Sequence, residues 1–421
     1  MPITNIYLSP FPSVGIGEML FLSIFPYLIF DLKGRKFRGS SYWVFFIYAI
    51  FITLIVSFFQ ADSNASDIIF KLLRDSVYVC IFLLFGQFYF NVNYAIKIYS
   101  KIVLLVSSYL FLQVISFRIF NFTLPWIIKF LPINYVGLSS NEYISKYVGM
   151  YYHQFRPTSI FLEPAHFAQY VIPCLILFLF PYKKNEVIKL KSALYVSIAL
   201  LFSSSAIGII LMLVTWSIWF LKNGVDSKNI GYKFFLILSF AVAIGVCFYL
   251  YQSGNEYVRV LSRIGEINLN AEDQSSGNIR VLRGFNIWSQ FPELFKILGI
   301  GFGNYETFVV NNSINTFLYN VNGASDYMST ISDILVYSGV LGAILFLRFM
   351  MKSFLVGSFT CKSLIIIMLL MFFASSLYSS PLYAICMSFI LYLPFENKQE
   401  NMNIVGSGVR ESESKLCNIK L

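Results

Sequence analysis

Long apolar runs alternate with short polar segments along the 421 residues of this chain. The runs lie near 15–30, 42–60, 76–90, 102–120, 164–180, 192–221, 234–250, 328–347 and 363–393. Most have about 15–20 residues, the length that an α-helix needs to cross a hydrocarbon core roughly 30 Å thick. The pattern predicts an all-α polytopic membrane protein.

Two of the runs, 192–221 and 363–393, are too long for one ordinary span, since a helix rises about 1.5 Å per residue. Small polar residues interrupt both of them: "SSSA" at 203–206 and "SSLYSSP" at 375–381. Each run is therefore predicted to form a tight helical hairpin. The predicted number of membrane-spanning helices becomes about eleven, within a range of roughly 10–12.

Composition agrees with this class, because 57% of the residues are hydrophobic and only 12% are charged. A soluble domain usually carries about 25% charged residues. The six cysteines show no Cys-x-x-Cys spacing, so neither a disulfide framework nor a zinc site is indicated. No nucleotide-binding motif occurs on the predicted cytoplasmic side. We expect no metal, no other cofactor and no nucleic-acid partner.

Basic residues orient the chain in the membrane. Short segments near 31–41, 91–101, 181–191, 222–233 and 348–362, with the tail from 394, hold about 20 of the 31 lysines and arginines. The positive-inside rule places them in the cytoplasm and the N-terminus outside. The predicted layout is N-terminal helices 1–120, a first large extracytoplasmic loop 121–163, central helices 164–250, a second large extracytoplasmic loop 251–327, C-terminal helices 328–393 and a disordered cytoplasmic tail 394–421.

Arginines run against this charge bias on the outer side. They are Arg74, Arg118, Arg156, Arg259, Arg263, Arg280 and Arg283. A guanidinium group binds phosphate or carboxylate through two parallel hydrogen bonds, which an ammonium group cannot do. The outer arginines predict an anion site; the alternative is that they pair with outer acidic residues.

The second large loop carries apolar residues near helical spacing over 279–297. They predict an amphipathic helix on the membrane surface, bent at Pro292. Arg280 and Arg283 are three positions apart and share a face of that helix. Three glycines follow, Gly299, Gly301 and Gly303. They either form a turn that ends the helix or place backbone amides around an anion.

The first large loop ends in "RPTSIFLEPAHFAQY", residues 156–170. Pro164 suits the first position of a helix, which places Glu163 at the N-cap. The competing interpretation makes Glu163 a general base at the rim of a site, with His166 as a second candidate. Arg156 stands at a membrane boundary, where an arginine is costly without a partner, and is a candidate anion ligand.

Two stretches carry a resemblance to a known family. They are the mid-chain "R…SIFLEP.HFAQY" and the later "ILGIGFGNYE", in which Arg283 precedes Gly299 by fifteen intervening residues. With the many predicted spans, they resemble bacterial O-antigen and capsule repeat-unit polymerases of the Wzy type. The same spacing from Arg156 ends at Ile172, so the first loop departs from the family pattern.

The resemblance implies a fold similar to metal-independent, lipid-sugar-using (GT-C-like) glycosyltransferases in the bacterial cytoplasmic (inner) membrane. It implies oligosaccharide repeat units on undecaprenyl diphosphate as substrates, displayed on the outer face and joined into O-antigen, capsular or exopolysaccharide chains. Arg156, Arg280 and Arg283 would neutralise the leaving diphosphate. Glu163 or His166 would act as the base. Membrane lipids, a flippase and a chain-length regulator are the implied partners.

Two alternatives remain open. O-antigen ligases share the layout but use a histidine in the later loop, and residues 251–327 contain none, which favours a polymerase. A flippase or transporter of lipid-linked oligosaccharides is expected to show internal repeats and ionisable residues deep within spans. Glu18 and Asp333 are the candidates for such residues, and no clear repeat is seen.

Overall fold

The computed structural model describes residues 16–32, 40–59, 65–124, 156–161, 163–182, 187–226, 281–316, 328–378 and 380–393. All regular structure in these ranges is helical. Four helices are long and apolar enough to cross a membrane: Tyr42–Phe59, Val92–Phe120, Ala206–Asn223 and Thr330–Val356. These helices indicate a multi-pass membrane protein. The count of about eleven spans stays a prediction.

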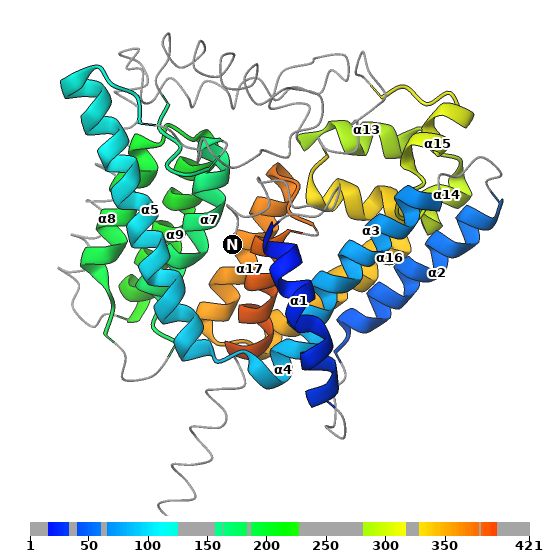
Figure 1. The fold of residues 1–421 in the computed structure, drawn as a ribbon, viewed down its shortest axis with the longest axis horizontal. Coiled ribbons are helices and arrows are strands. Elements are labelled where there is room, and N and C mark those ends of the chain that lie inside the picture. Colours follow the sequence, from blue (N-terminus) through cyan, green and yellow to red (C-terminus); the bar gives the residue numbers. More distant parts are fainter. Residues whose placement is uncertain are drawn as a thin grey trace, which may run out of the picture.

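The helices form two groups, with helix α17 between them. In order they are α1 (Ile16–Asp31), α2 (Tyr42–Phe59), α3 (Ala65–Val79), a π-helical segment (Cys80–Phe85), α4 (Gly86–Tyr89), α5 (Val92–Phe120), α7 (Pro164–Leu179), α8 (Leu190–Phe202), α9 (Ala206–Asp226), α13 (Arg283–Ser289), α14 (Glu293–Leu298), α15 (Tyr305–Asn311), α16 (Thr330–Val356), α17 (Phe359–Ala374) and the helix Pro381–Leu393. Figure 1 shows α5 and α7–α9 on one side, α2, α3 and α13–α16 on the other, and α17 between them. Helix α17 packs against α7, α9 and α16, which joins the two groups.

The predicted interruptions of the two long apolar runs are confirmed. Residues 203–205 separate α8 from α9, and residues 375–380 separate α17 from the helix Pro381–Leu393. Helices α8 and α9 pack against each other, and the indole Nε1 of Trp216 donates to Ser197 Oγ at 2.9 Å. Serine-rich breaks therefore end these helices, as the sequence pattern indicates.

Several helices are longer than their apolar runs. Helix α5 begins at Val92, where the Asn91 side chain accepts from the amide of Tyr94 as an N-cap. Helix α16 continues to Val356, and α3 begins at Ala65. Residues 97, 101, 348 and 352, which the charge pattern placed in inner loops, are therefore helical. Long basic side chains extend their charged ends to water from turns near either end of a membrane helix, so they do not end it.

Large apolar side chains occupy both the core and the outer surface. Tyr42, Phe82 and Phe349 are almost fully buried, and the ring of Tyr42 meets both phenylalanines edge-on at 5.0–5.3 Å. On the outer face of α2, Phe51 and Phe58 are 59% and 85% exposed. A helix that is apolar all round fits a lipid environment better than water.

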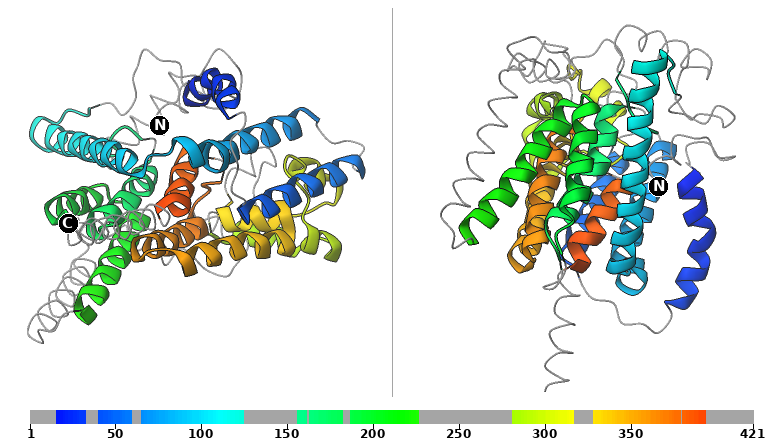
Figure 2. Two further views of the ribbon diagram at one scale, coloured as in Figure 1. Left: turned by 90° about the horizontal axis from the view of Figure 1, so that it is seen from below. Right: turned by 90° about the vertical axis from the view of Figure 1, so that its left-hand side faces the viewer.

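Helix α1 lies at the edge of the bundle (Figure 2). Glu18 attaches it to α3: its carboxylate accepts from Tyr78 Oη at 2.7 Å and lies 3.5 Å from Arg74 Nε. Arg74 thus pairs with an acidic residue, as the alternative interpretation of the outer arginines expected. The predicted apolar run 234–250, residues 125–155 of the first loop and the tail 394–421 lie outside the described residues.

Candidate functional site

The segment that leads into α7 is fixed by Gln113 of α5. The Gln113 amide donates to the carbonyl of Ser159 at 2.9 Å and accepts from the Ser159 amide at 2.8 Å. The hydroxyl of Ser159 also donates to the carbonyl of Val106 at 2.6 Å. These bonds hold Ser159 at a φ of 57°, a left-handed conformation that is uncommon for serine. Part of the "RPTSIFLEP" stretch is therefore structural.

Helix α7 begins at Pro164 with Glu163 as its N-cap residue, which confirms the predicted helix start. The Glu163 backbone is extended, with φ −133° and ψ 152°, and its side chain makes no capping hydrogen bond to the first turn. The amide of His166 donates to the Glu163 carbonyl at 3.1 Å, and the His166 side chain is exposed. Any effect of Glu163 on the helix thus comes from its charge near the positive end of the dipole.

Arg156 contacts the break between α8 and α9. Its Nη2 donates to the carbonyl of Ser204 at 3.0 Å, and Ser204 has a φ of 52°. A cation near the C-terminus of a helix stabilises the carbonyls that have no helical partner. Arg156 therefore has a structural contact, and its role as an anion ligand stays a prediction.

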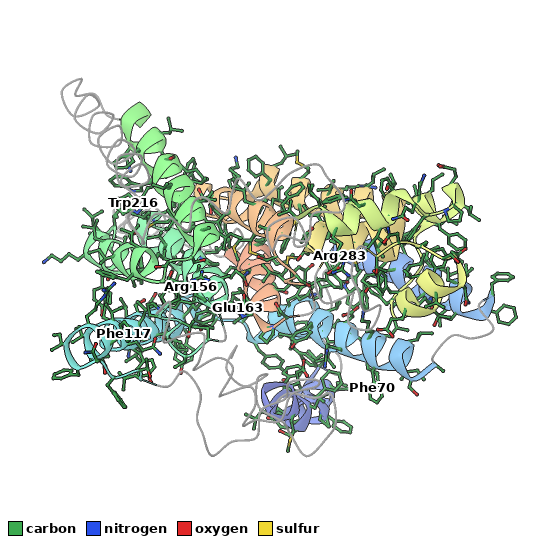
Figure 3. The ribbon with its side chains drawn as sticks, turned by 90° about the horizontal axis from the view of Figure 1, so that it is seen from above. Phe70, Phe117, Arg156, Glu163, Trp216 and Arg283 are labelled. Carbon is green, nitrogen blue, oxygen red and sulfur yellow. The ribbon has the colours of Figure 1, made fainter. Side chains whose placement is uncertain are left out.

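The predicted site residues do not form one cluster. Figure 3 shows Arg156 and Glu163 near each other, while Arg283 lies apart from them. Arg156 and Glu163 belong to the group of α5 and α7–α9, whereas Arg283 begins α13, which packs on α16. Arg280, predicted to share a helix face with Arg283, lies outside the described residues.

Arg283 is buried, with 3% of its surface exposed. Its Nε donates to the carbonyl of Thr316 at 3.0 Å. Its guanidinium also lies close to Tyr305 of α15. Burial raises the pKa of the Tyr305 hydroxyl above its ordinary value, and the positive charge of Arg283 opposes that rise only in part. Tyr305 therefore stays protonated and neutral beside the cation.

The residue after Arg283 brings α13 against the first turn of α16. A Cβ on Gly284 would collide with the side chain of Ser332, so only glycine allows this approach. Asp333, the next residue on α16, is 6% exposed and its Oδ2 accepts from Ser376 Oγ at 3.2 Å. Tyr305 interacts electrostatically with Asp333 as well as with Arg283. The charges of a carboxylate and a guanidinium thus both act on one tyrosine.

Helix α3 adds a second cation and a second carboxylate. Lys71 Nζ donates to Tyr337 Oη at 2.9 Å and lies 4.8 Å from the centre of that ring. Lys71 also interacts electrostatically with Asp333 and with Asp75, which is 5% exposed. We call this set the charged cluster: Lys71, Asp75, Arg283, Tyr305, Asp333 and Tyr337.

Sequence reasoning found only Arg283 and Asp333 of the charged cluster. Lys71 and Asp75 were missed because they precede the apolar run that begins near 76, which the pattern assigned as the start of a helix. The available signal was their spacing: residues four apart lie on one face of a helix. Had α3 been extended back to Ala65, this pair would have appeared as a polar stripe leading into an apolar helix.

The glycines that follow α14 form a tight turn. Gly299, Gly301 and Gly303 have φ angles of 88°, 76° and 79°. The amides of residues 299–302 all donate within the protein, to Phe295 O at 2.8 Å, Val336 O at 3.1 Å, Tyr337 O at 2.8 Å and Thr53 Oγ1 at 2.8 Å. The turn interpretation fits this geometry. The amides of Gly299 and Gly301 are thereby engaged within the protein, and anion binding by the loop stays a prediction.

The predicted amphipathic helix over 279–297 is two short helices in the part that the structure describes. Helix α13 ends at Ser289, and α14 starts after Pro292, its N-cap. Gln290 stabilises the turn between them, since its side-chain amide donates to Asn315 O and accepts from Asn315 N, both at 3.0 Å. Ile287 and Phe291 are buried in the protein and pack on α15 and α16, whereas Leu294 and Ile297 are exposed, so contact with the membrane surface stays a prediction.

Chemically, the charged cluster places a planar cation close to a neutral hydroxyl, on which the charge of a nearby carboxylate also acts. Within the described residues, no group of three or more His, Cys, Asp and Glu side chains is arranged to hold a metal ion. Comparison with family models, with curated proteins and with solved structures finds no match for this chain.

Proposed function

We propose that the chain is a membrane glycosyltransferase that joins lipid-linked oligosaccharide repeat units into a polysaccharide. The reaction takes place on the outer face of the bacterial cytoplasmic membrane. One observation carries the proposal: Arg283, predicted to be outside, is buried close to a tyrosine hydroxyl on which the charge of Asp333 also acts. A buried arginine next to polar groups is an ordinary way to stabilise a developing phosphate charge.

The orientation of the helices supports a site on one side of the membrane. In Figure 1 the C-terminal end of α5, the N-terminal end of α7 and helix α13 all lie toward the upper side. These elements border the two segments predicted to be large extracytoplasmic loops. A substrate held on that side would meet both segments.

The chemistry needs three contributions. The bond between the donor sugar and its diphosphate must break, so a cation has to neutralise the leaving group. The acceptor sugar must lose a hydroxyl proton, so a base has to lie within hydrogen-bond reach. Arg283 supplies the cation; Arg156 and Arg280 stay predicted additional ligands. Glu163 and His166, the predicted bases, lie in the other group of helices, apart from Arg283.

Reconstitution tests the proposal. The purified full-length chain, in lipid vesicles, receives undecaprenyl-diphosphate-linked repeat units, and products are separated by size. We expect a ladder of glycans that remain on the lipid diphosphate. Transfer of a preformed glycan only to a different acceptor, with no ladder, would identify a ligase and contradict the proposal.

A transporter of lipid-linked oligosaccharides is the second candidate. It is favoured by the buried Asp75 and Asp333 and the partly buried Lys71, since ionisable residues inside the helices of a membrane protein commonly mark a transport pathway. The same vesicles distinguish a transporter from a polymerase when the labelled lipid-linked oligosaccharide is initially present on only one face of the membrane. Appearance of the label on the opposite face without a new glycosidic bond would support transport.

A further inference from the structure

We propose that Asp333 is the general base of this site and takes the proton of the acceptor hydroxyl while Arg283 binds the donor diphosphate. This inference rests on the proposed function. It assigns to Asp333 the role that sequence reasoning gave to Glu163 or His166.

The packing of α13 on α16 brings together the residues adjacent to Arg283 and Asp333. Gly284, directly after Arg283, packs on Ser332, directly before Asp333. The charges of both groups act on the hydroxyl of Tyr305. The Ser376 hydroxyl donates to one oxygen of the Asp333 carboxylate at 3.2 Å, which orients the group. Two helices that are far apart in the sequence therefore present a carboxylate and a guanidinium to one place.

Asp75 is the other buried carboxylate of the charged cluster, and its surroundings differ. Its charge acts on the buried Tyr42 and Tyr383 and on the partly buried Tyr378, which pack in the core. Asp75 lies on α3, where the cations that act on it are Lys71 and Arg74. Of these two carboxylates, Asp333 is the one whose adjacent residue, Ser332, packs on the residue next to Arg283.

Lys71 contributes a second positive charge. Its ammonium group donates to the Tyr337 hydroxyl and interacts electrostatically with Asp333. We assign Lys71 the role of a positioning residue, because it reaches the reacting groups through Asp333 and Tyr337. Arg283 and Asp333 are both buried.

The step balances in atoms and charge. The acceptor oxygen forms a bond to the anomeric carbon of the donor sugar as its proton passes to the Asp333 carboxylate. The bond between that carbon and the diphosphate oxygen breaks, and its electron pair leaves with the undecaprenyl diphosphate beside Arg283. The proton then leaves Asp333 to water, which restores the carboxylate for the next cycle.

The test uses the reconstituted full-length protein and the same lipid-linked repeat units. Asp333→Asn retains the shape and the acceptor oxygen for Ser376 but cannot take up a proton. We expect turnover to fall at least about 100-fold, while the donor concentration for half-maximal rate changes by less than about threefold. If Asp333 had a purely structural role, the variant would not lower turnover while leaving the donor concentration for half-maximal rate nearly unchanged. Glu293→Gln, at an exposed carboxylate on α14, is the matched control and should keep the wild-type rate.

The outcomes separate this inference from the proposed function. If wild-type protein makes no glycan ladder, the proposed function fails. If wild-type protein elongates the glycan and Asp333→Asn does so within about threefold of its rate, the function stands and the role of Asp333 is wrong. If the Asp333→Asn variant does not fold, Asp333→Glu serves as the test. We expect its turnover to be about tenfold lower, with donor binding retained. Wild-type turnover by Asp333→Glu would overturn the inference.

Discussion

Gly299 and Gly339 pack backbone against backbone, so closely that a Cβ on Gly299 would lie 2.6 Å from the amide nitrogen of Gly339. Gly339 interrupts α16 with φ 62° and ψ −171°. The break releases the carbonyls of Val336 and Tyr337 from the helical pattern, and the amides of Ile300 and Gly301 bond to them. The glycine turn of the second loop is thereby anchored in a membrane helix.

We expect Gly339→Ala to destabilise the protein by more than about 2 kcal/mol. The added methyl group would collide with the backbone around Gly299, and the positive φ alone costs alanine about 1–2 kcal/mol. Thermal unfolding in detergent measures the change. Val340→Ala, at the next and partly exposed position, is the control and should cost much less. Equal unfolding temperatures for the two variants would contradict this packing.

Gln113→Leu should lower the free energy of unfolding by about 1–3 kcal/mol. Leucine keeps the size of the side chain but leaves the buried amide and carbonyl of Ser159 without their Gln113 partners. Denaturant titration of the purified protein gives the value, with Leu112→Ala on the exposed face of α5 for comparison. A Gln113→Leu protein as stable as the wild type would show that Ser159 finds other partners.

The helical class and the helix breaks are predictable from this sequence, because lipid-facing and core-facing positions are both apolar and small polar residues mark the breaks. The N-cap at Glu163 is also predictable, since Pro164 fixes the first turn. Helix ends such as Val92 are not, because capping by Asn91 carries the helix past the apolar run.

The charged cluster is harder to predict because its members come from three distant segments. Lys71 meets Tyr337, and Gly284 meets Ser332, through packing that no local pattern encodes. The glycine spacing suggested an anion cradle, but only the structure reveals that the carbonyls freed by Gly339 accept from the amides of Ile300 and Gly301. Arg156 likewise stands near Glu163 in the sequence yet contacts the distant turn at Ser204.

Arg156→Gln should mainly affect stability. Its guanidinium bonds to the carbonyl of Ser204 at the break between α8 and α9, and loss of a charged hydrogen bond costs about 1.5–3 kcal/mol. The measurement pairs the unfolding temperature with the elongation rate per folded molecule. A stable variant with a much lower rate would instead support the predicted role of Arg156 as a diphosphate ligand.

Arg283→Lys should lower the elongation rate by about 10²–10³-fold, because lysine keeps the charge but loses the planar fork that holds a phosphate. The matched control is Arg348→Lys on the exposed face of α16, which should keep the wild-type rate. Both variants are assayed in vesicles with lipid-linked repeat units. Equal rates for the two would contradict the proposed diphosphate contact.

The two candidate bases make opposite predictions. Glu163 makes no capping hydrogen bond through its side chain, whereas Asp333 shares Tyr305 with Arg283. A base transfers its proton only within hydrogen-bond reach of the reacting hydroxyl, and its removal typically costs about 10²–10⁴-fold in rate. We therefore expect Asp333→Asn to reduce elongation at least about tenfold more than Glu163→Gln, measured per folded molecule on the same substrate. If Glu163→Gln reduced elongation more than Asp333→Asn, the base would be Glu163 at the start of α7. The donor would then have to lie beside Arg156 and not beside Arg283.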